Sequence, residues 1–458
     1  MSKKLSHVLL IGVGLFSSTW VMAAVKEYDL TIAEQTVNIT GKPVERITVN
    51  GKFVAPLLEF EEGDEAVIRV HNKLKNQDSS IHWHGLLLPG IMDGVPGFNK
   101  FNGIAPNKTY EYKFKVRQNG TYWYHSHSKG QEQDGLYGAF VIYPKDKTPL
   151  TAAEKTDKDY VVLLSDFHNS TSDQIMKNLK KEADYYQNRR ETVFDVLKQV
   201  KRDGLKATWQ DRSMWNQMRM LKTDMSDVTG YTFLMNGKTP QQNWTGNFKA
   251  GEKVRLRFIN ASAMSFFDVR IPNLKMTVVS ADGQPVKPVP VDEFRIGTAE
   301  TYDVIVTPTK DAHTIFAQNI DRSGYVAATL ATKEGARAAT PAMDKTEWLT
   351  MADMMGAMGA NGYKAKHAKT EYDFKSDMRV DSPRMNLDDP GINLRNINRE
   401  VLNYSQLRSV DEAIFAEQRK PTREIELHLT GNMERYIWAF DGVTFKDATP
   451  INIKPGER

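Results

Sequence analysis

Two histidine pairs with the same spacing are the residues of this sequence best suited to chemistry. His82 and His84 form one pair and His125 and His127 the other, each within a run of β-branched and aromatic residues. Side chains at positions i and i+2 of a β-strand point to the same face, so each pair presents two imidazoles side by side. Imidazole suits copper, zinc, iron and nickel, whereas oxygen ligands suit magnesium and calcium. We therefore predict a transition-metal site; chance pairing of core histidines is the less favoured explanation, because the sequence has only ten histidines.

Length and composition limit the number of domains, the class of partner and the chemistry of the site. A chain of 458 residues is too long to fold around one hydrophobic core of ordinary size, which suggests roughly two to four domains. The net charge of +4 is too small to indicate a nucleic-acid partner. Cysteine is absent, which excludes disulfides, thiolate catalysis and thiolate metal ligands within these residues.

Residues 1–24 have the pattern of a secretory signal. Two lysines precede an apolar run over Val8–Val21, and small residues follow before Val25. A single membrane anchor is the alternative, but the run is short for a bilayer span and contains two serines. No twin-arginine pair precedes the run, so we expect Sec-type export, no stable membrane insertion after cleavage, and a periplasmic mature protein.

Residues 25–150 read as a β-sandwich. Short segments with alternating inward and outward residues are separated by Gly, Pro, Asn and Asp, a pattern that predicts half-buried antiparallel strands. The four clearest segments are Tyr28–Ile32, Ala66–Val70, Thr109–Val116 and Ala139–Tyr143.

A sequence phrase then repeats. The phrase consists of Asn-Gly-Lys, then a turn with Gly and an acidic residue, then a strand. It occurs at residues 50–72 and again at 236–260. A third copy begins with Phe-Asp-Gly at 440–442 and reaches its Gly-acidic turn at residues 453–458. Repeats this far apart indicate duplicated domains and not a solenoid, whose period is about 20–50 residues. We predict a second sandwich over 151–335, the start of a third over 421–458, and a chain truncated at residue 458.

The regions between the repeats differ in character. Residues 171–225 fit a helical period and predict one or two helices inserted in the second domain. Single histidines outside the pairs are expected to be structural or surface residues, which leaves the second domain as a scaffold without its own site. They are His71, His168, His313, His367 and His428.

Residues 336–420 look like a linker that contains a dense group of methionines. Thioether sulfur selects Cu(I), so a copper-gathering loop is one hypothesis. The same spacing also fits one face of a small helix that buries its methionines, and the two interpretations remain open. The methionines concerned are Met351, Met354, Met355 and Met358.

Four phrases around the histidines resemble the first domain of multicopper oxidases. They are Ile81–Gly85, Met92–Pro96, Thr121–His127 and Asp134–Gly138. The helical insert, the Met-rich linker and the segment Leu402–Arg408 are similar to the bacterial copper-resistance protein A branch. The resemblance implies an all-β fold of tandem cupredoxin-like Greek-key sandwiches, with the third domain incomplete and a helical insert in the second.

The resemblance also implies a trinuclear copper cluster between the first and third domains. His82 would bind the type 2 copper, and His84, His125 and His127 the type 3 pair. Asp93 would assist proton delivery to dioxygen; it also fits the role of an Asp-Gly turn residue, and the two roles can coexist. The family's type 1 copper needs a cysteine and the cluster needs two further histidine pairs, all absent from these 458 residues. We expect them to lie beyond Arg458.

Two functions follow as expectations. The first is an exported copper-resistance oxidase that oxidises Cu(I) or phenol-like donors, reduces dioxygen to water, and works beside other periplasmic copper-handling proteins. The alternative is a non-catalytic periplasmic protein that binds and sequesters copper. Zinc binding is a weaker third possibility, because four histidines also satisfy zinc.

Overall fold

The computed structural model describes residues 24–147, 154–187, 189–355, 364–377, 379, 386–412, 419–432 and 434–458. Residues 1–23, which form nearly all of the expected signal, lie outside the described residues. Among the residues described, no helix is long and apolar enough to cross a membrane.

Two four-stranded sheets form the first sandwich, as the alternating segments predict. One sheet has the order β2-β1-β4-β6 and the other β3-β8-β7-β5, and a single apolar core fills the space between them. Trp83 is at the centre of this core, with its indole ring packed against Tyr112 and Phe140. The strands are β1 (Val25–Val37), β2 (Val44–Val49), β3 (Leu58–Glu61), β4 (Glu65–Asn72), β5 (His82–His84), β6 (Thr109–Lys115), β7 (Gly120–His125) and β8 (Tyr137–Tyr143).

The prediction of purely antiparallel, half-buried strands is wrong in two respects. β1 runs parallel to β4, and β3 runs parallel to β8. β8 is also buried on both faces along nearly its whole length. Tyr137 and Ala139 of β8 pack against Leu163 and Ile259, which belong to the next sandwich, so the outward face of β8 is covered by apolar side chains.

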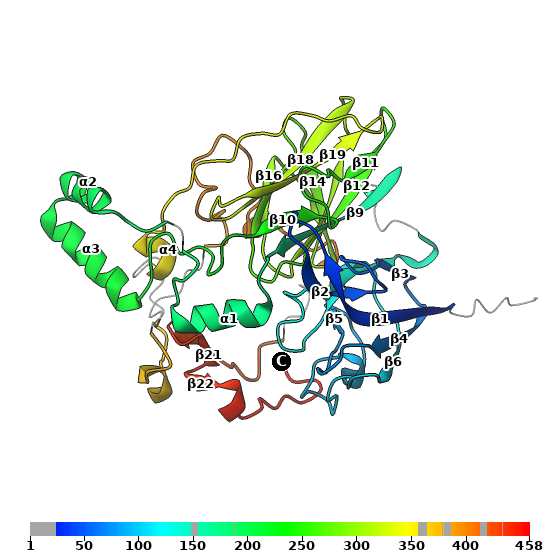
Figure 1. The fold of residues 1–458 in the computed structure, drawn as a ribbon, viewed down its shortest axis with the longest axis horizontal. Coiled ribbons are helices and arrows are strands. Elements are labelled where there is room, and N and C mark those ends of the chain that lie inside the picture. Colours follow the sequence, from blue (N-terminus) through cyan, green and yellow to red (C-terminus); the bar gives the residue numbers. More distant parts are fainter. Residues whose placement is uncertain are drawn as a thin grey trace, which may run out of the picture.

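The second sandwich consists of a six-stranded and a five-stranded sheet, ordered β10-β9-β12-β17-β14-β15 and β11-β19-β18-β13-β16 (Figure 1). Its core includes Phe258, Phe267 and Phe294, all fully buried. Its strands are β9 (Lys158–Phe167), β10 (Thr232–Met235), β11 (Thr245–Asn247), β12 (Val254–Asn260), β13 (Phe267–Arg270), β14 (Met276–Ala281), β15 (Gln284–Val291), β16 (Glu293–Ile296), β17 (Thr301–Val306), β18 (Ala312–Asn319) and β19 (Tyr325–Ala331).

The helical insert contains three helices among its described residues, where one or two were predicted. They are α1 (Ser172–Lys181), α2 (Val193–Asp203) and α3 (Leu205–Met218). Gly204 has φ 87°, a conformation that breaks a right-handed helix, so the continuous periodic pattern is divided into α2 and α3. The two helices form a hairpin that projects to one side of the sheets (Figure 1).

The repeated phrase forms the same turn at each of its three positions. The Asn-Gly or Asp-Gly pair has φ angles of 50° and 73° at residues 50–51, 50° and 74° at 236–237, and 52° and 73° at 441–442. In each copy the side chain of the first turn residue accepts a hydrogen bond from the backbone of a neighbouring segment, at Thr31 N in β1, Leu163 N in β9 and His428 N just before the strand that begins at Leu429. The third copy leads into a small sheet of β20 (Leu429–Asn432), β21 (Ile437–Phe440) and β22 (Val443–Thr444).

The segment before that sheet is anchored to the second sandwich. Leu394 and Leu402 are buried, and Leu402 belongs to the same apolar core as Phe294. Val401 forms a parallel bridge with Glu293 at the edge of β16. A one-turn helix, α4 (Met351–Met355), precedes this segment.

Candidate metal centre

Strand pairing brings the two histidine pairs together. β5 is antiparallel to β7 in a register that sets His82 opposite His125. His84 lies two residues further along β5, and His127 follows the end of β7. The ring centroid of His82 is 5.5 Å from that of His84, 5.5 Å from that of His125 and 5.3 Å from that of His127. The four imidazoles thus form one cluster.

The nitrogen positions within the cluster fit a bound metal ion. His84 Nδ1 lies 3.2 Å from His125 Nε2. Two nitrogens on one tetrahedral ion, each at about 2.0–2.1 Å, are about 3.3 Å apart. Ligand atoms of His82, His84 and His125 lie within 4.8 Å of one another. The donor set is entirely imidazole, which fits copper and zinc and does not fit magnesium or calcium.

Hydrogen bonds set which nitrogen each ring presents. His82 Nδ1 is 2.8 Å from the backbone oxygen of Asp93, so this nitrogen carries the proton and donates it. His125 Nδ1 is 2.7 Å from the Glu132 carboxylate and 3.1 Å from the Ser126 carbonyl oxygen. In both rings Nε2 is left with its lone pair available for a metal. Partners of this kind orient metal-binding histidines in many proteins.

Electrostatics favours the neutral form of the ligands. Burial lowers the pKa of His84 to about 4, and the neighbouring His125 imidazole adds to the effect. Burial also lowers the pKa of His82 and of His127. A metal binds the neutral imidazole, so these three side chains are ready to bind at neutral pH without first losing a proton.

Asp93 lies at the end of a short 3₁₀ helix, Gly90–Met92, with one carboxylate oxygen 3.5 Å from His82 Nδ1. Its side chain is 34% exposed, so the carboxylate touches both the histidine cluster and solvent. Gly94 has φ 77°, and a Cβ there would lie 1.7 Å from the Ile81 carbonyl oxygen. Glycine therefore allows the Asp93 loop to lie directly against β5, and the turn role and the proximity to His82 coexist.

The loop after β7 is held by a polar network that sequence reasoning missed. Gln131 is 2% exposed, and its Oε1 accepts hydrogen bonds from Ser126 Oγ at 2.9 Å and from Ser79 Oγ at 2.7 Å. His127 N donates to Ser80 Oγ at 3.0 Å. Serine and glutamine between Gly-rich turns look like ordinary loop residues, and only the contacts between residues 79–80 and 126–131 reveal their role.

Removing the Glu132 carboxylate should weaken metal binding without removing a ligand. In Glu132→Ala the His125 ring loses its 2.7 Å partner, so its tautomer and orientation are less well defined. We expect about 10–100-fold weaker copper binding, the usual cost of losing an outer partner. Equilibrium dialysis of copper measures the change. Glu111→Ala, which removes an exposed carboxylate beside Arg69, is the control, and equal affinities in the two variants would contradict this role for Glu132.

The role of the methionines in copper binding remains a prediction. Met351 and Met354 lie on α4 and are partly exposed. Of Met355 only the backbone is described, and Met358 lies outside the described residues. Neither the copper-gathering loop nor the buried helical face is tested by these positions.

The single histidines divide into two groups. His313, His71 and His168 make local contacts, as expected: for example, His313 Nε2 accepts the backbone N–H groups of residues 309 and 310. His367 and His428 were also expected to be unrelated structural residues, but they meet at Glu371.

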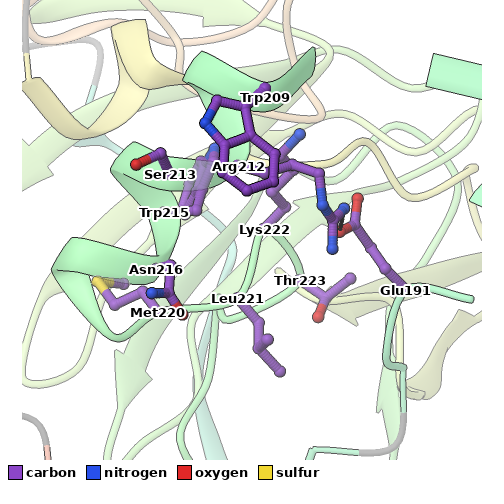
Figure 2. Close-up of a pocket in the computed structure, with 10 residues that line it drawn as sticks. All are labelled: Glu191, Trp209, Arg212, Ser213, Trp215, Asn216, Met220, Leu221, Lys222 and Thr223. Atoms are coloured by element: carbon purple, nitrogen blue, oxygen red, sulfur yellow. Dashed lines mark hydrogen bonds and ion pairs between the residues drawn. The ribbon is translucent and has the colours of Figure 1, made fainter. Parts of the chain in front are cut away.

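A hollow of about 380 Å³ lies beside α3, and Figure 2 shows its lining. Its two aromatic side chains are Trp209, whose ring is largely exposed, and Trp215, which is buried. The charged groups that line it already form ion pairs: Arg212 pairs with Glu191, and Lys222 pairs with Asp211. None of the four clustered histidines lines this hollow, so it is not the metal centre.

Comparisons with known proteins agree with this geometry. Two family models, each described as multicopper oxidase, match residues 31–147 and 158–335. The chain is 46% identical to copper resistance protein A of Escherichia coli and 47% identical to a copper resistance protein A homolog of Pseudomonas syringae pv. tomato. Both alignments cover 94% of this chain and 79% of the relative.

Solved structures show the same kind of fold. A laccase from Botrytis aclada superposes with a TM-score of 0.54 at 26% identity, over 71% of this chain and 56% of that one. The multicopper oxidase Fet3p, described as functioning in iron import, superposes with a TM-score of 0.52 at 24% identity, over 70% of this chain and 55% of that one.

Proposed function

This chain belongs to the multicopper oxidase family, and from that premise we propose that it serves in copper resistance as an exported oxidase of Cu(I) or phenol-like donors. The family consists of oxidoreductases that use copper, and the fold is cupredoxin-like, as the resemblance implies. The convergence of four imidazoles on one site carries the proposal. The lysine-then-apolar pattern of residues 1–24 supports export to the periplasm.

The histidines would divide between two kinds of copper. We assign His82 to the type 2 copper, and His84, His125 and His127 to the type 3 pair. The 3.2 Å approach of His84 Nδ1 to His125 Nε2 supports a shared ion for those two rings. Asp93 holds Nδ1 of His82 through its backbone oxygen, so His82 presents Nε2, on the other side of the ring, to the metal.

When bound, copper would supply the four one-electron transfers that convert dioxygen and four protons into two water molecules. The role of the protein is to keep the imidazoles neutral and oriented and to provide protons. Asp93 is placed for the second task, because its carboxylate lies beside His82 and reaches solvent. Residues 25–150 would provide this half of the centre, 151–335 the scaffold, and 336–420 the connection to 421–458.

A second function is favoured by one observation. The sequence has no cysteine, so no thiolate among its 458 residues can hold an electron-entry copper. On its own, the chain would then bind copper without turnover, as a sequestering protein does. Zinc remains a competitor for the same imidazoles.

The test compares the 458-residue chain with the complete product of its gene, whatever its length. Both are loaded with copper, and oxygen uptake is measured after addition of Cu(I) or a phenol. We expect the complete product to consume oxygen and to be blue, and the 458-residue chain to bind copper without intense blue absorbance. A complete product that binds copper but takes up no oxygen would favour sequestration, and zinc retained in preference to copper would favour the third possibility.

A further inference from the structure

A second group of potential metal ligands lies outside the histidine cluster. His367 Nδ1 is 2.8 Å from one oxygen of the Glu371 carboxylate, and His428 Nδ1 is 2.9 Å from the other. The two imidazole centroids are 5.0 Å apart. One nitrogen from each histidine and one carboxylate oxygen all lie within 4.8 Å of one another.

The ligands come from two segments that pack tightly together. Glu371 and His367 belong to the turn around a 3₁₀ helix at Lys369–Tyr372, whereas His428 directly precedes β20. Thr370 Oγ1 donates to the Asp441 carbonyl oxygen at 2.5 Å, and a Cβ at Gly442 would lie 2.2 Å from the Thr370 carbonyl oxygen. Because His428 N donates to Asp441 Oδ1 at 2.8 Å, the third copy of the repeated turn holds both segments in place.

Burial limits how the Glu371 carboxylate can be stabilised. Glu371 is fully buried, the His367 side chain is 6% exposed and the His428 side chain 18% exposed. A carboxylate that is removed from water must be hydrogen-bonded and is further stabilised by a nearby cation. Ala368 N donates to Glu371 Oε1 at 2.7 Å, and the two imidazoles stabilise the carboxylate either as hydrogen-bond donors or through a metal ion that they share with it.

The partners of His428 fit a metal-bound ring. His428 faces carboxylates with both nitrogens: Nδ1 faces Glu371, and Nε2 lies 2.7 Å from Glu426. With a metal on Nδ1, the ring is neutral and its Nε2–H donates to Glu426, which is the carboxylate–histidine–metal arrangement of many metalloproteins.

We propose that His367, Glu371 and His428 bind a divalent transition cation, Zn²⁺ or Cu²⁺, which fastens the segment around residue 371 to the β20–β22 sheet. Two imidazoles and one carboxylate match the ligand set of known zinc sites and also suit Cu²⁺. The site shares no residue with the His82–His127 cluster. It therefore stands independently of the oxidase proposal.

Zinc counting by equilibrium dialysis of the metal-free chain tests the site. We expect His367→Gln and His428→Gln each to bind one Zn²⁺ fewer per chain than the parent, at a zinc concentration that saturates the parent. His71→Gln is the matched control, because His71 pairs with Asp29 and Thr109 far from Glu371 in the sequence, and it should retain the parent's count. The same dialysis with Cu²⁺ shows which of the two cations the site prefers.

Two further variants guard against a folding artefact. Glu426→Gln removes no ligand and should weaken zinc binding at this site about 10–100-fold. Hydrogen exchange of β20 and β21 should slow when zinc is added to the parent, and should not respond to zinc in Glu371→Gln. Unchanged zinc counts in both histidine variants, or exchange in the parent that ignores zinc, would overturn the site and leave a metal-free ion cluster. Oxygen uptake is not involved in any of these measurements.

Discussion

The His84→Ala variant is expected to lose copper from the histidine cluster. His84 Nδ1 lies 3.2 Å from His125 Nε2, so alanine removes one of two nitrogens placed to share an ion. The loss of affinity should exceed the about 10–100-fold that removal of an outer partner costs. If the complete gene product is the proposed oxidase with a type 1 copper, its oxygen uptake should disappear while blue absorbance remains, because His84 is assigned to the type 3 pair. Copper content after dialysis and oxygen uptake measure the two effects.

The control for this experiment is His313→Ala. His313 Nε2 accepts the backbone N–H groups of Thr309 and Lys310, at 3.2 Å and 3.1 Å, so its loss should leave the copper content unchanged. His125→Ala and His127→Ala should behave like His84→Ala. Full copper content and full oxygen uptake in His84→Ala would show that the assignment of the cluster is wrong.

The Asp303→Ala variant is expected to destabilise the protein more than any surface substitution. Asp303 is 1% exposed and accepts hydrogen bonds from Thr121 Oγ1 at 2.7 Å, Arg255 Nε at 3.1 Å and Arg257 Nη1 at 3.2 Å. Alanine would leave both buried guanidinium groups without this partner. Breaking a buried ion pair from one side costs about 3–5 kcal/mol.

Urea denaturation measures this loss, and the exposed ion pair of Arg69 with Glu111 is the control. Glu111→Ala should cost only about 0–1 kcal/mol, because solvent screens that pair. Thr121 lies on β7, four residues before His125, so the Asp303 variant should also loosen the metal centre. A loss in Asp303→Ala no greater than that in Glu111→Ala would contradict the role of this network.

The pH dependence of stability gives a second readout. Burial alone would raise the pKa of Asp303, but the attraction of Arg255 and Arg257 outweighs it and the pKa is lowered from its ordinary value of 3.8. A lowered pKa means that the contribution of Asp303 is complete above the unfolded value and is lost as the pH falls through the folded value. The stability difference between parent and Asp303→Ala should therefore be constant near neutral pH and shrink only below about pH 4.

Local patterns in the sequence determined the family and the fold class, and they identified the candidate ligands. The spacing of His82 and His84 is sufficient to place two imidazoles on one face, because the strand period is two residues. The comparisons confirm the family that the flanking phrases indicate. The repeated Asn-Gly and Asp-Gly phrases likewise predict a recurring turn, and residues 50–51, 236–237 and 441–442 adopt it with nearly equal φ angles.

Contacts between distant segments decided the rest. The parallel pairing of β3 with β8 and the burial of both faces of β8 depend on a neighbouring sandwich, which the alternation within residues 139–143 does not encode. The outer partners of the ligands, Glu132 and Gln131, look like ordinary loop residues until the loop is folded.

The same reason explains why His428 was expected to be a solitary structural residue. It is 57 residues from Glu371, and no local period connects the two positions. By itself, the sequence determined which side chains can bind a metal and which of them share a strand. Only the tertiary structure decided which ones meet across strands and segments, because those distances depend on how separate elements pack and not on the spacing within any one of them.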